Sequence, residues 1–241
     1  MKKIVFGLVC AKLAFLSIMF AAACQTAQLS PLENTAAMAT PTPVVPNDNI
    51  NRPTSEPYKG DLSIFEDENR AKNLQIERVM DILKIKDGKT VADIGAGSGW
   101  FTVRAAKRVG AGGKVFAVEI NPDAITYIND RAKKENLPNI QTILGTEDDA
   151  KLSADSIDAV MILKTYHEIA QPVKLFEKLR PALKKDALVG IIDRSGDGTD
   201  HGLNKEVVID EMKRAGFKKV DDYDFTKADG QDYFLVFRAA K

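Results

Sequence analysis

The pattern with the clearest chemistry begins at Val91 and reads Val-Ala-Asp-Ile-Gly-Ala-Gly-Ser-Gly-Trp. Three glycines alternate in it, at Gly95, Gly97 and Gly99, and they follow the acid Asp93. Glycine has no Cβ, so a ligand can approach the backbone N–H groups of such a turn closely. The turn follows a strand-like apolar run and precedes a helical pattern. In that context it predicts a site for a small ligand rather than a plain turn.

Two classes of ligand bind at turns of this kind, and the spacing separates them. A dinucleotide-binding turn reads G-x-G-x-x-G, with a small residue where this chain has Trp100. The spacing here is G-x-G-x-G after an acid, and it resembles motif I of class I S-adenosylmethionine-dependent methyltransferases. The resemblance implies that the loop binds the amino and carboxylate ends of S-adenosyl-L-methionine. The residues to which it gives this role are Asp93, Gly95, Ala96, Gly97 and Gly99.

Later acidic segments match the same family. Glu119 ends the next strand-like run, and a carboxylate there can accept hydrogen bonds from both ribose hydroxyls of the cofactor. Ile120 follows it in the same binding segment. After the third strand-like run, Glu147 or Asp148 takes the place of the acid that contacts the adenine amino group, and Asp148 is favoured. Lys164, after the fourth run, completes the predicted cofactor site.

The residues that would act on the methyl acceptor follow the fourth and fifth strand-like runs. A sulfonium methyl is already activated, so an enzyme mainly aligns the acceptor and, where needed, removes a proton. The candidate catalytic residues are Tyr166, His167, Glu168 and His201. Both histidines of the chain are in this set, and an imidazole with an ordinary pKa of about 6.5 has a useful neutral fraction as a general base. The structural alternatives are packing for Tyr166, a helix N-terminal charge for Glu168 and turn formation for His167.

Imidazoles and carboxylates near the same rim also provide the ligand types of a metal site. These residues are His167, Glu168, Asp193, Asp200 and His201. No spacing within the sequence fixes such a site, so no metal is expected. Both cysteines lie in the first 25 residues, which excludes a Cys-rich metal site or a thiol nucleophile in the folded part.

The elements that must position these residues alternate between strand and helix. The predicted strands span 90–94, 114–119, 140–144, 157–163, 187–193, 218–225 and 232–238. The predicted helices span 67–84, 99–109, a segment opened by Asn121-Pro122, 173–179 and 204–215. This alternation predicts an α/β fold with a doubly wound, mostly parallel seven-stranded sheet. A turn at 227–230 predicts that the last two strands form an antiparallel hairpin.

The first 57 residues differ in composition from the remainder. Residues 1–24 combine an N-terminal Met-Lys-Lys, an apolar stretch and a final Ala-Ala-Ala-Cys, which resembles the signal and lipobox of bacterial lipoproteins. We therefore expect export to the cell envelope with a lipid on Cys24, or a cytoplasmic protein if the signal is not used. Residues 25–57 are rich in Pro, Thr and Asn and predict a disordered linker. The methyltransferase domain is expected over 58–241.

Composition and loop lengths limit the partners. Lys+Arg and Asp+Glu both number 34, so the net charge is zero, which argues against nucleic acid as a partner. The fourth and fifth predicted strands are joined without a sizeable insertion, so any lid over the acceptor must come from 58–73 and from the loop at 197–203. A modest cover of this kind suits a small or medium-sized methyl acceptor.

The resemblance spans residues 62–238 and is greatest to a bacterial group of exported, predicted methyltransferases that pair this glycine-rich motif with Tyr-His-Glu, here Tyr166-His167-Glu168. It implies methyl transfer from S-adenosyl-L-methionine to an acceptor that the sequence does not name. Because this cofactor is made in the cytosol and the front end predicts export, two other hypotheses remain open. One is a non-catalytic nucleoside-binding module of the same fold on the cell envelope. The other is a nicotinamide-dependent oxidoreductase, which Trp100 disfavours.

Overall fold

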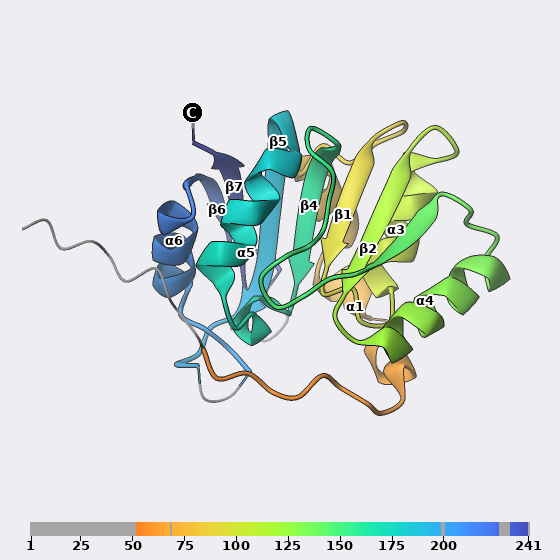
Figure 1. Ribbon diagram of the computed structural model, residues 1–241, viewed down its shortest axis with the longest axis horizontal. Coiled ribbons are helices and arrows are strands. Elements are labelled where there is room, and N and C mark those ends of the chain that lie inside the picture. The colour runs from red at the N-terminus through yellow and green to blue at the C-terminus, as the bar shows by residue number, and fades with distance from the viewer. Residues whose placement is uncertain (1–51, 68, 199–200, 227–231, 241) are drawn as a thin grey trace, which may run out of the picture. The chain divides into compact units, whose positions relative to one another are not determined.

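Seven strands form one sheet in the order β3-β2-β1-β4-β5-β7-β6 (Figure 1). Their bounds are β1 Thr90–Ile94, β2 Lys114–Glu119, β3 Ile140–Leu144, β4 Ile157–Leu163, β5 Leu183–Arg194, β6 Phe217–Tyr223 and β7 Asp232–Ala239. Strands β1 to β5 pair in parallel, and β7 is antiparallel to both β5 and β6. The predicted doubly wound sheet with a C-terminal antiparallel pair is confirmed, and β5 begins four residues earlier than the sequence predicts.

The computed structural model describes residues 52–67, 69–198, 201–226 and 232–240. The predicted signal segment 1–24 and most of the predicted linker 25–57 therefore lie outside the described residues, and the boundaries of these segments stay predictions. Within the described ranges, every helix is too short or too polar to cross a lipid bilayer.

Helices cover both faces of the sheet. Their bounds are α1 Arg70–Asn73, α2 Ile76–Ile82, α3 Trp100–Val109, α4 Pro122–Lys134, α5 Pro172–Leu179 and α6 Lys205–Arg214, with 3-10 helices at Leu62–Phe65, Tyr166–Glu168 and Arg180–Ala182. Apolar side chains of α2 and α3 share one core with one face of the central strands. Those of α5 and α6 form a second core against the opposite face, and α4 packs beside β2 and β3.

Strand β4 shows why the central strands are apolar throughout. Its residues alternate between the two cores: Ala159 and Met161 face α2 and α3, whereas Val160 and Ile162 face α5 and α6. All four are at most 1% exposed. A parallel strand with helices on both faces needs an apolar residue at every position, so a continuous hydrophobic run replaces polar alternation.

The single helix predicted over 67–84 is wrong. The chain forms two short helices there, separated by Gln75, which has a left-handed φ of 47°. The flanking Leu74 and Ile76 are both buried in the same core. In one continuous helix these two side chains would point about 160° apart, on nearly opposite faces, so the break is what allows both to be buried in one core.

The carboxyl ends of the five parallel strands all lie at the same end of the sheet. The strand order reverses between β1 and β4, because β2 lies on one side of β1 and β4 on the other. In open α/β sheets this switch point is where ligands bind. Figure 1 shows the N-terminal described segment, in orange, running along this end of the sheet. The fold thus brings loops from many parts of the sequence to one place.

Candidate active site

A cavity of about 710 Å³ lies at this end of the sheet. One part of its wall contains Gly95, Gly97 and Glu119 from the ends of β1 and β2, and another contains His167 and Glu168 after β4. Cavities of several hundred Å³ are typical of small-molecule sites. The structure therefore brings the predicted cofactor segment and the predicted acceptor segment into one cavity.

The glycine-rich turn between β1 and α3 has the backbone that its glycines permit. Gly95 and Gly97 line the cavity with φ of 71° and 54°. A Cβ at Gly97 would meet nothing within 4 Å, so the space beside it is open for a ligand, whereas a Cβ at Gly95 would overlap Thr165 Cγ2 at 2.2 Å. Gly99 caps α3 instead and approaches Ile128, and Ala96 is buried outside the cavity wall.

Glu119, the last residue of β2, is hydrogen-bonded to the glycine-rich turn that follows β1. Its Oε2 accepts a hydrogen bond from the Gly97 N–H at 2.9 Å, and its Oε1 accepts from the N–H groups of Ile120 and Asn121 at 2.8 and 3.2 Å. Three backbone donors fix the carboxylate at the cavity wall and leave Oε2 able to accept a further hydrogen bond. Ile120 is 42% exposed and lines the cavity beside it.

Asp93 lies beneath the turn rather than in the cavity wall. It is 2% exposed, and its Oδ2 accepts a hydrogen bond from Thr102 Oγ1 at 2.6 Å. Burial is the largest influence on this carboxyl, and with the charge of Glu119 it raises the pKa of Asp93 to about 7 although Thr102 opposes the shift. Asp93 thus contacts α3 through Thr102, and its predicted contact with the cofactor stays a prediction.

Two of the three remaining predicted cofactor residues line the cavity, and the third lies on the protein surface outside it. Glu147 lines the cavity. Asp148, which the sequence favours, is turned to Lys178 Nζ at 2.6 Å, and this contact together with the Thr146 hydroxyl holds the pKa of Asp148 below its usual value. The placement therefore favours Glu147. Lys164 also lines the cavity, and its ammonium pairs with the buried carboxylate of Asp232.

His167 is the best-oriented titratable group of the acceptor side. Its Nδ1 lies 2.9 and 3.0 Å from the two oxygens of Asp193, whose side chain is fully buried at the end of β5. Asp193 also accepts the backbone N–H groups of His167 and Arg194. The carboxylate is therefore held in place, and it directs the Nδ1 proton of the neutral ring toward itself and leaves Nε2 as the acceptor.

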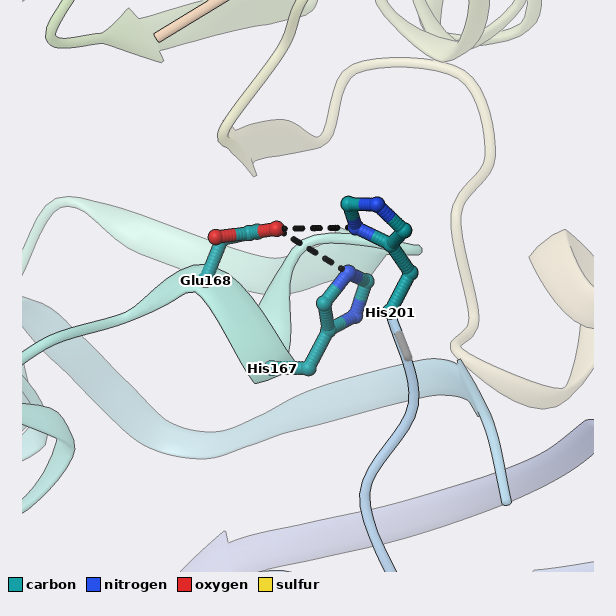
Figure 2. Close-up of side chains that lie close together, drawn as sticks. All are labelled: His167, Glu168 and His201. Carbon is teal, nitrogen blue, oxygen red and sulfur yellow. Dashed lines mark hydrogen bonds and ion pairs between the residues drawn. The ribbon is translucent and has the colours of Figure 1, made fainter. Parts of the chain in front are cut away.

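Glu168 lies between the two histidines. Its Oε1 is 3.6 Å from His167 Nε2 and 3.2 Å from His201 Nδ1 (Figure 2). The N–H and hydroxyl of Ser55 donate to the same carboxylate at 2.7 and 2.9 Å. Burial alone raises the pKa of Glu168, but these hydrogen bonds and the imidazoles outweigh it and hold the pKa below its usual value. The sequence expectation that both histidines share one rim is met.

Tyr166 is not part of the cavity wall. It is fully buried, stacks on Phe176 at 5.7 Å, and donates its hydroxyl to Glu211 Oε2 at 3.0 Å. Burial and the Glu211 charge raise its pKa well above 10. The packing alternative describes this tyrosine, and its candidate role in catalysis is corrected on that ground.

The sequence gives no signal for one part of the site, the segment 52–57 at the end of the predicted linker. Thr54, Ser55, Glu56 and Pro57 line the cavity. Arg52 anchors the segment through a 2.5 Å ion pair with buried Glu211 and a hydrogen bond to the Tyr166 carbonyl. Polar residues and prolines are typical both of a free linker and of an extended segment that packs against a domain. Only the tertiary structure therefore reveals that the segment 52–57 contributes to the cavity wall. Of the predicted lid, Tyr58 and Leu62 reach the wall on one side and His201 on the other.

A doubly wound sheet, a glycine-rich turn with G-x-G-x-G spacing after β1 and an acid at the end of β2 facing one cavity agree with the architecture of a class I S-adenosylmethionine-dependent methyltransferase. The family described as methyltransferase domain matches residues 85–225, and the chain belongs to that family. S-adenosyl-L-methionine is therefore its cofactor, as the sequence predicts. Gly95, Gly97 and Glu119 fit that cofactor, because the space beside Gly97 is open and the Glu119 carboxylate is fixed at the wall.

Similar curated proteins are methyltransferases for different acceptors. The chain is 34% identical over 99 residues to a tRNA (guanine(37)-N(1))-methyltransferase of Pyrococcus abyssi, covering 41% of this chain and 28% of that protein. It is 28% identical over 112 residues to a protein-L-isoaspartate O-methyltransferase of Pyrococcus horikoshii, covering 46% and 49%. The chain thus spans about half the length, or less, of such relatives.

Solved structures support the fold. A SAM-dependent methyltransferase from Aquifex aeolicus superposes with a TM-score of 0.67 at 24% identity, over 73% of this chain and 95% of that one. A [4+2]-cyclase superposes with a TM-score of 0.61 at 12% identity, over 79% and 86%. Because a cyclase shares it, the fold alone does not define the reaction.

Proposed function

We propose that the protein transfers the methyl group of S-adenosyl-L-methionine to a small or medium-sized acceptor bound between the glycine-rich turn and His167. The observation that carries this proposal is that the buried Asp193 orients an imidazole in the same cavity that Gly97 and Glu119 line. Methyl transfer to an acceptor that carries an ionisable proton requires both a cofactor-binding segment and an oriented base.

On the cofactor side, the chain's own groups bind without moving far. Glu119 is already fixed by three backbone N–H groups, so little further ordering is needed when its free acceptor capacity takes a ribose hydroxyl. The open space at Gly97 lets the methionine end approach the backbone. Glu147 at the wall is the acid best placed for the adenine end.

On the acceptor side, His167 Nε2 takes the proton from an O–H, N–H or S–H group of the acceptor. The freed electron pair forms a bond to the methyl carbon as the carbon–sulfur bond breaks, leaving neutral S-adenosylhomocysteine. Asp193 stabilises the imidazolium that results, because its carboxylate lies 2.9 Å from Nδ1. The cavity of about 710 Å³ must hold the cofactor as well as the acceptor. The space left for the acceptor is therefore limited, which supports an acceptor of modest size.

The test is calorimetric titration of the full-length, untagged protein with S-adenosylhomocysteine, followed by radiolabelled methyl transfer to a panel of amines, phenols, thiols and carboxylic acids. Glu119→Ala should weaken binding by about 100-fold, because it removes a charged acceptor and loosens the turn. His167→Ala should leave binding within about twofold and slow transfer by about 10²–10⁴-fold.

Each other hypothesis gives a different result. A nucleoside-binding module would bind S-adenosylhomocysteine and transfer no methyl group to any acceptor, and His167→Ala would change nothing. A nicotinamide-dependent oxidoreductase would bind the dinucleotide more tightly than S-adenosylhomocysteine. Absence of S-adenosylhomocysteine binding would end the methyl-transfer proposal.

We also propose that the chain is exported and lipid-anchored at Cys24 in the cell envelope. The support is the N-terminal charge, the apolar stretch and the Ala-Ala-Ala-Cys sequence at 21–24. Labelling of cells with a radioactive fatty acid should mark the wild-type protein and leave Cys24→Ala unmarked. Equal labelling, or none in either, would contradict the anchor.

A further inference from the structure

The cluster formed by His167, Glu168 and His201 has a geometry beyond what a single general base needs. One potential ligand atom from each of the three side chains lies within 4.8 Å of the others. Figure 2 shows both imidazole rings turned toward the same carboxylate. The chain has only two histidines, and both are in this cluster. Two imidazole nitrogens and a carboxylate are the ligand set of catalytic zinc sites and of non-haem iron sites.

Asp193 supplies a second, independent feature of a metal site. A metal-binding histidine commonly donates its other ring N–H to a carboxylate, which fixes the ring and increases its basicity. His167 has this arrangement: Nδ1 faces the fully buried Asp193 at 2.9 Å, and Nε2 faces Glu168. Ser55 does the same for Glu168: its N–H donates to Oε2 at 2.7 Å and its hydroxyl donates to Oε1 at 2.9 Å, and this Oε1 also faces both imidazole rings.

We propose that His167 Nε2, Glu168 Oε1 and His201 Nδ1 bind one divalent transition-metal ion of the zinc or iron(II) type. Metal–nitrogen bonds of about 2.0–2.1 Å place ligand atoms about 3.4 Å apart in a tetrahedral site. The 3.2 and 3.6 Å contacts of Glu168 already match that spacing. His201 is the side chain that must approach His167, and its 69% exposure leaves it room to do so.

Such an ion would deepen the proposed methyl transfer, on which this consequence rests. Three protein ligands leave a coordination position open to the cavity. An acceptor oxygen or sulfur bound there loses its proton to solvent at a lower pH. Its anion then forms the bond to the methyl carbon while the carbon–sulfur bond of the cofactor breaks. With the ion bound, His167 would serve as a ligand, and the ion would supply the acceptor activation that the imidazole supplies as a general base when no metal is bound.

The test titrates the full-length, untagged protein, freed of metal by a chelator, with Zn²⁺ by calorimetry and with Co²⁺ by visible absorption. We expect one equivalent to bind with a dissociation constant on the order of micromolar or below. His201→Ala and Glu168→Gln should weaken binding by at least about 10-fold to 100-fold, as removal of even an outer-shell partner does. Glu147→Gln, a carboxylate of the same cavity outside the cluster, should bind metal as the wild type does.

Nitrogen NMR of the imidazoles gives a readout that does not depend on a variant. Because the chain has two histidines, Zn²⁺ should shift Nε2 of His167 and Nδ1 of His201 and no other imidazole signal. Absence of saturable binding, or binding that both variants leave unchanged, would show a hydrogen-bonded cluster only and overturn the proposal. S-adenosylhomocysteine titration of the same samples reports separately on the methyl-transfer proposal, so failure of one is distinguishable from failure of the other.

Discussion

The cofactor side and the acceptor side of the cavity are built in different ways. The cofactor side is a local structure: the Gly97 N–H donates to Glu119, 22 residues away, and Gly97 follows β1 while Glu119 ends the neighbouring strand β2. The acceptor side joins remote segments, since Glu168 binds Ser55 across 113 residues and His201 across 33. The first depends on backbone conformation and on the absence of side chains, whereas the second depends on polar and charged side chains held by remote partners.

This difference implies different sensitivity to change. Substitutions in the cofactor side should act through steric fit at single positions. Those in the acceptor side should act through the loss of partners for buried charges, with effects on stability as well as function. The predictions below test that contrast, from the largest expected effect to the smallest.

Arg52→Ala should have the largest effect on stability although Arg52 precedes the predicted domain. It removes the cation that pairs with Glu211 at 2.5 Å, where the two side chains are 10% and 5% exposed. Loss of one partner of a buried ion pair costs about 3–5 kcal/mol. Urea unfolding measures this change. Lys59→Ala, which removes an exposed ion pair with Glu56 of the same segment, is the control and should leave stability unchanged. A loss under about 1 kcal/mol for Arg52→Ala would show that the segment is only loosely attached.

Gly95→Ala should destabilise the protein by about 2–5 kcal/mol through changes in the cofactor side. The left-handed φ of 71° costs about 1–2 kcal/mol, and overlap of the new methyl with Thr165 Cγ2 costs about 1–3 kcal/mol more. Gly88→Ala, at φ 75° with open space around it, isolates the backbone cost alone. Thr165→Ser removes the overlapping methyl and should restore part of the stability of Gly95→Ala. If it restores none, the loop and β4 do not pack as described.

Asp93 should make stability depend on pH. Its pKa is raised to about 7 in the folded protein from 3.8, so the native state binds more protons than the unfolded state between these values. Stability should therefore fall as pH rises from about 4 to about 7, by up to about 1.4 kcal/mol per pH unit, and be flat above. Asp93→Asn should lose this component in pH-dependent urea unfolding, whereas Asp186→Asn, at an exposed position on β5, should keep it. Stability that rises over this range in the wild type alone would contradict the buried placement.

The smallest expected effect is on ligand affinity, and it tests whether Glu147 or Asp148 contacts the adenine end of the cofactor. Glu147→Gln should weaken S-adenosylhomocysteine binding by about threefold to tenfold, the range expected for one hydrogen bond. Asp148→Asn breaks a half-exposed pair with Lys178, which should cost at most about 1 kcal/mol of stability and leave ligand affinity unchanged. Calorimetry of both variants decides between them. The opposite pattern would restore Asp148 as the adenine contact.

Prediction succeeded where one segment contains all the necessary information. Alternating glycines after an apolar run indicate a strand, a tight turn and a helix without reference to the remainder of the chain, and Glu119 follows at the end of the next strand. It failed where neighbours decide: the 67–84 pattern is helical, yet burial of both Leu74 and Ile76 requires the break at Gln75. The positions of Tyr166 and Asp148 also depend on neighbours, because each turns away from the cavity to a remote partner, Glu211 and Lys178.

The sequence by itself determined the class of fold, the family and the cofactor, because hydrophobic periodicity and glycine spacing are local properties. Only the tertiary structure decided which polar side chains meet. It placed His167 against Asp193, put Glu168 between two histidines, and laid residues 52–57 across the cavity. A charged side chain can pair with any opposite charge that the fold brings near, and sequence spacing does not contain that choice when the partners lie far apart in the chain.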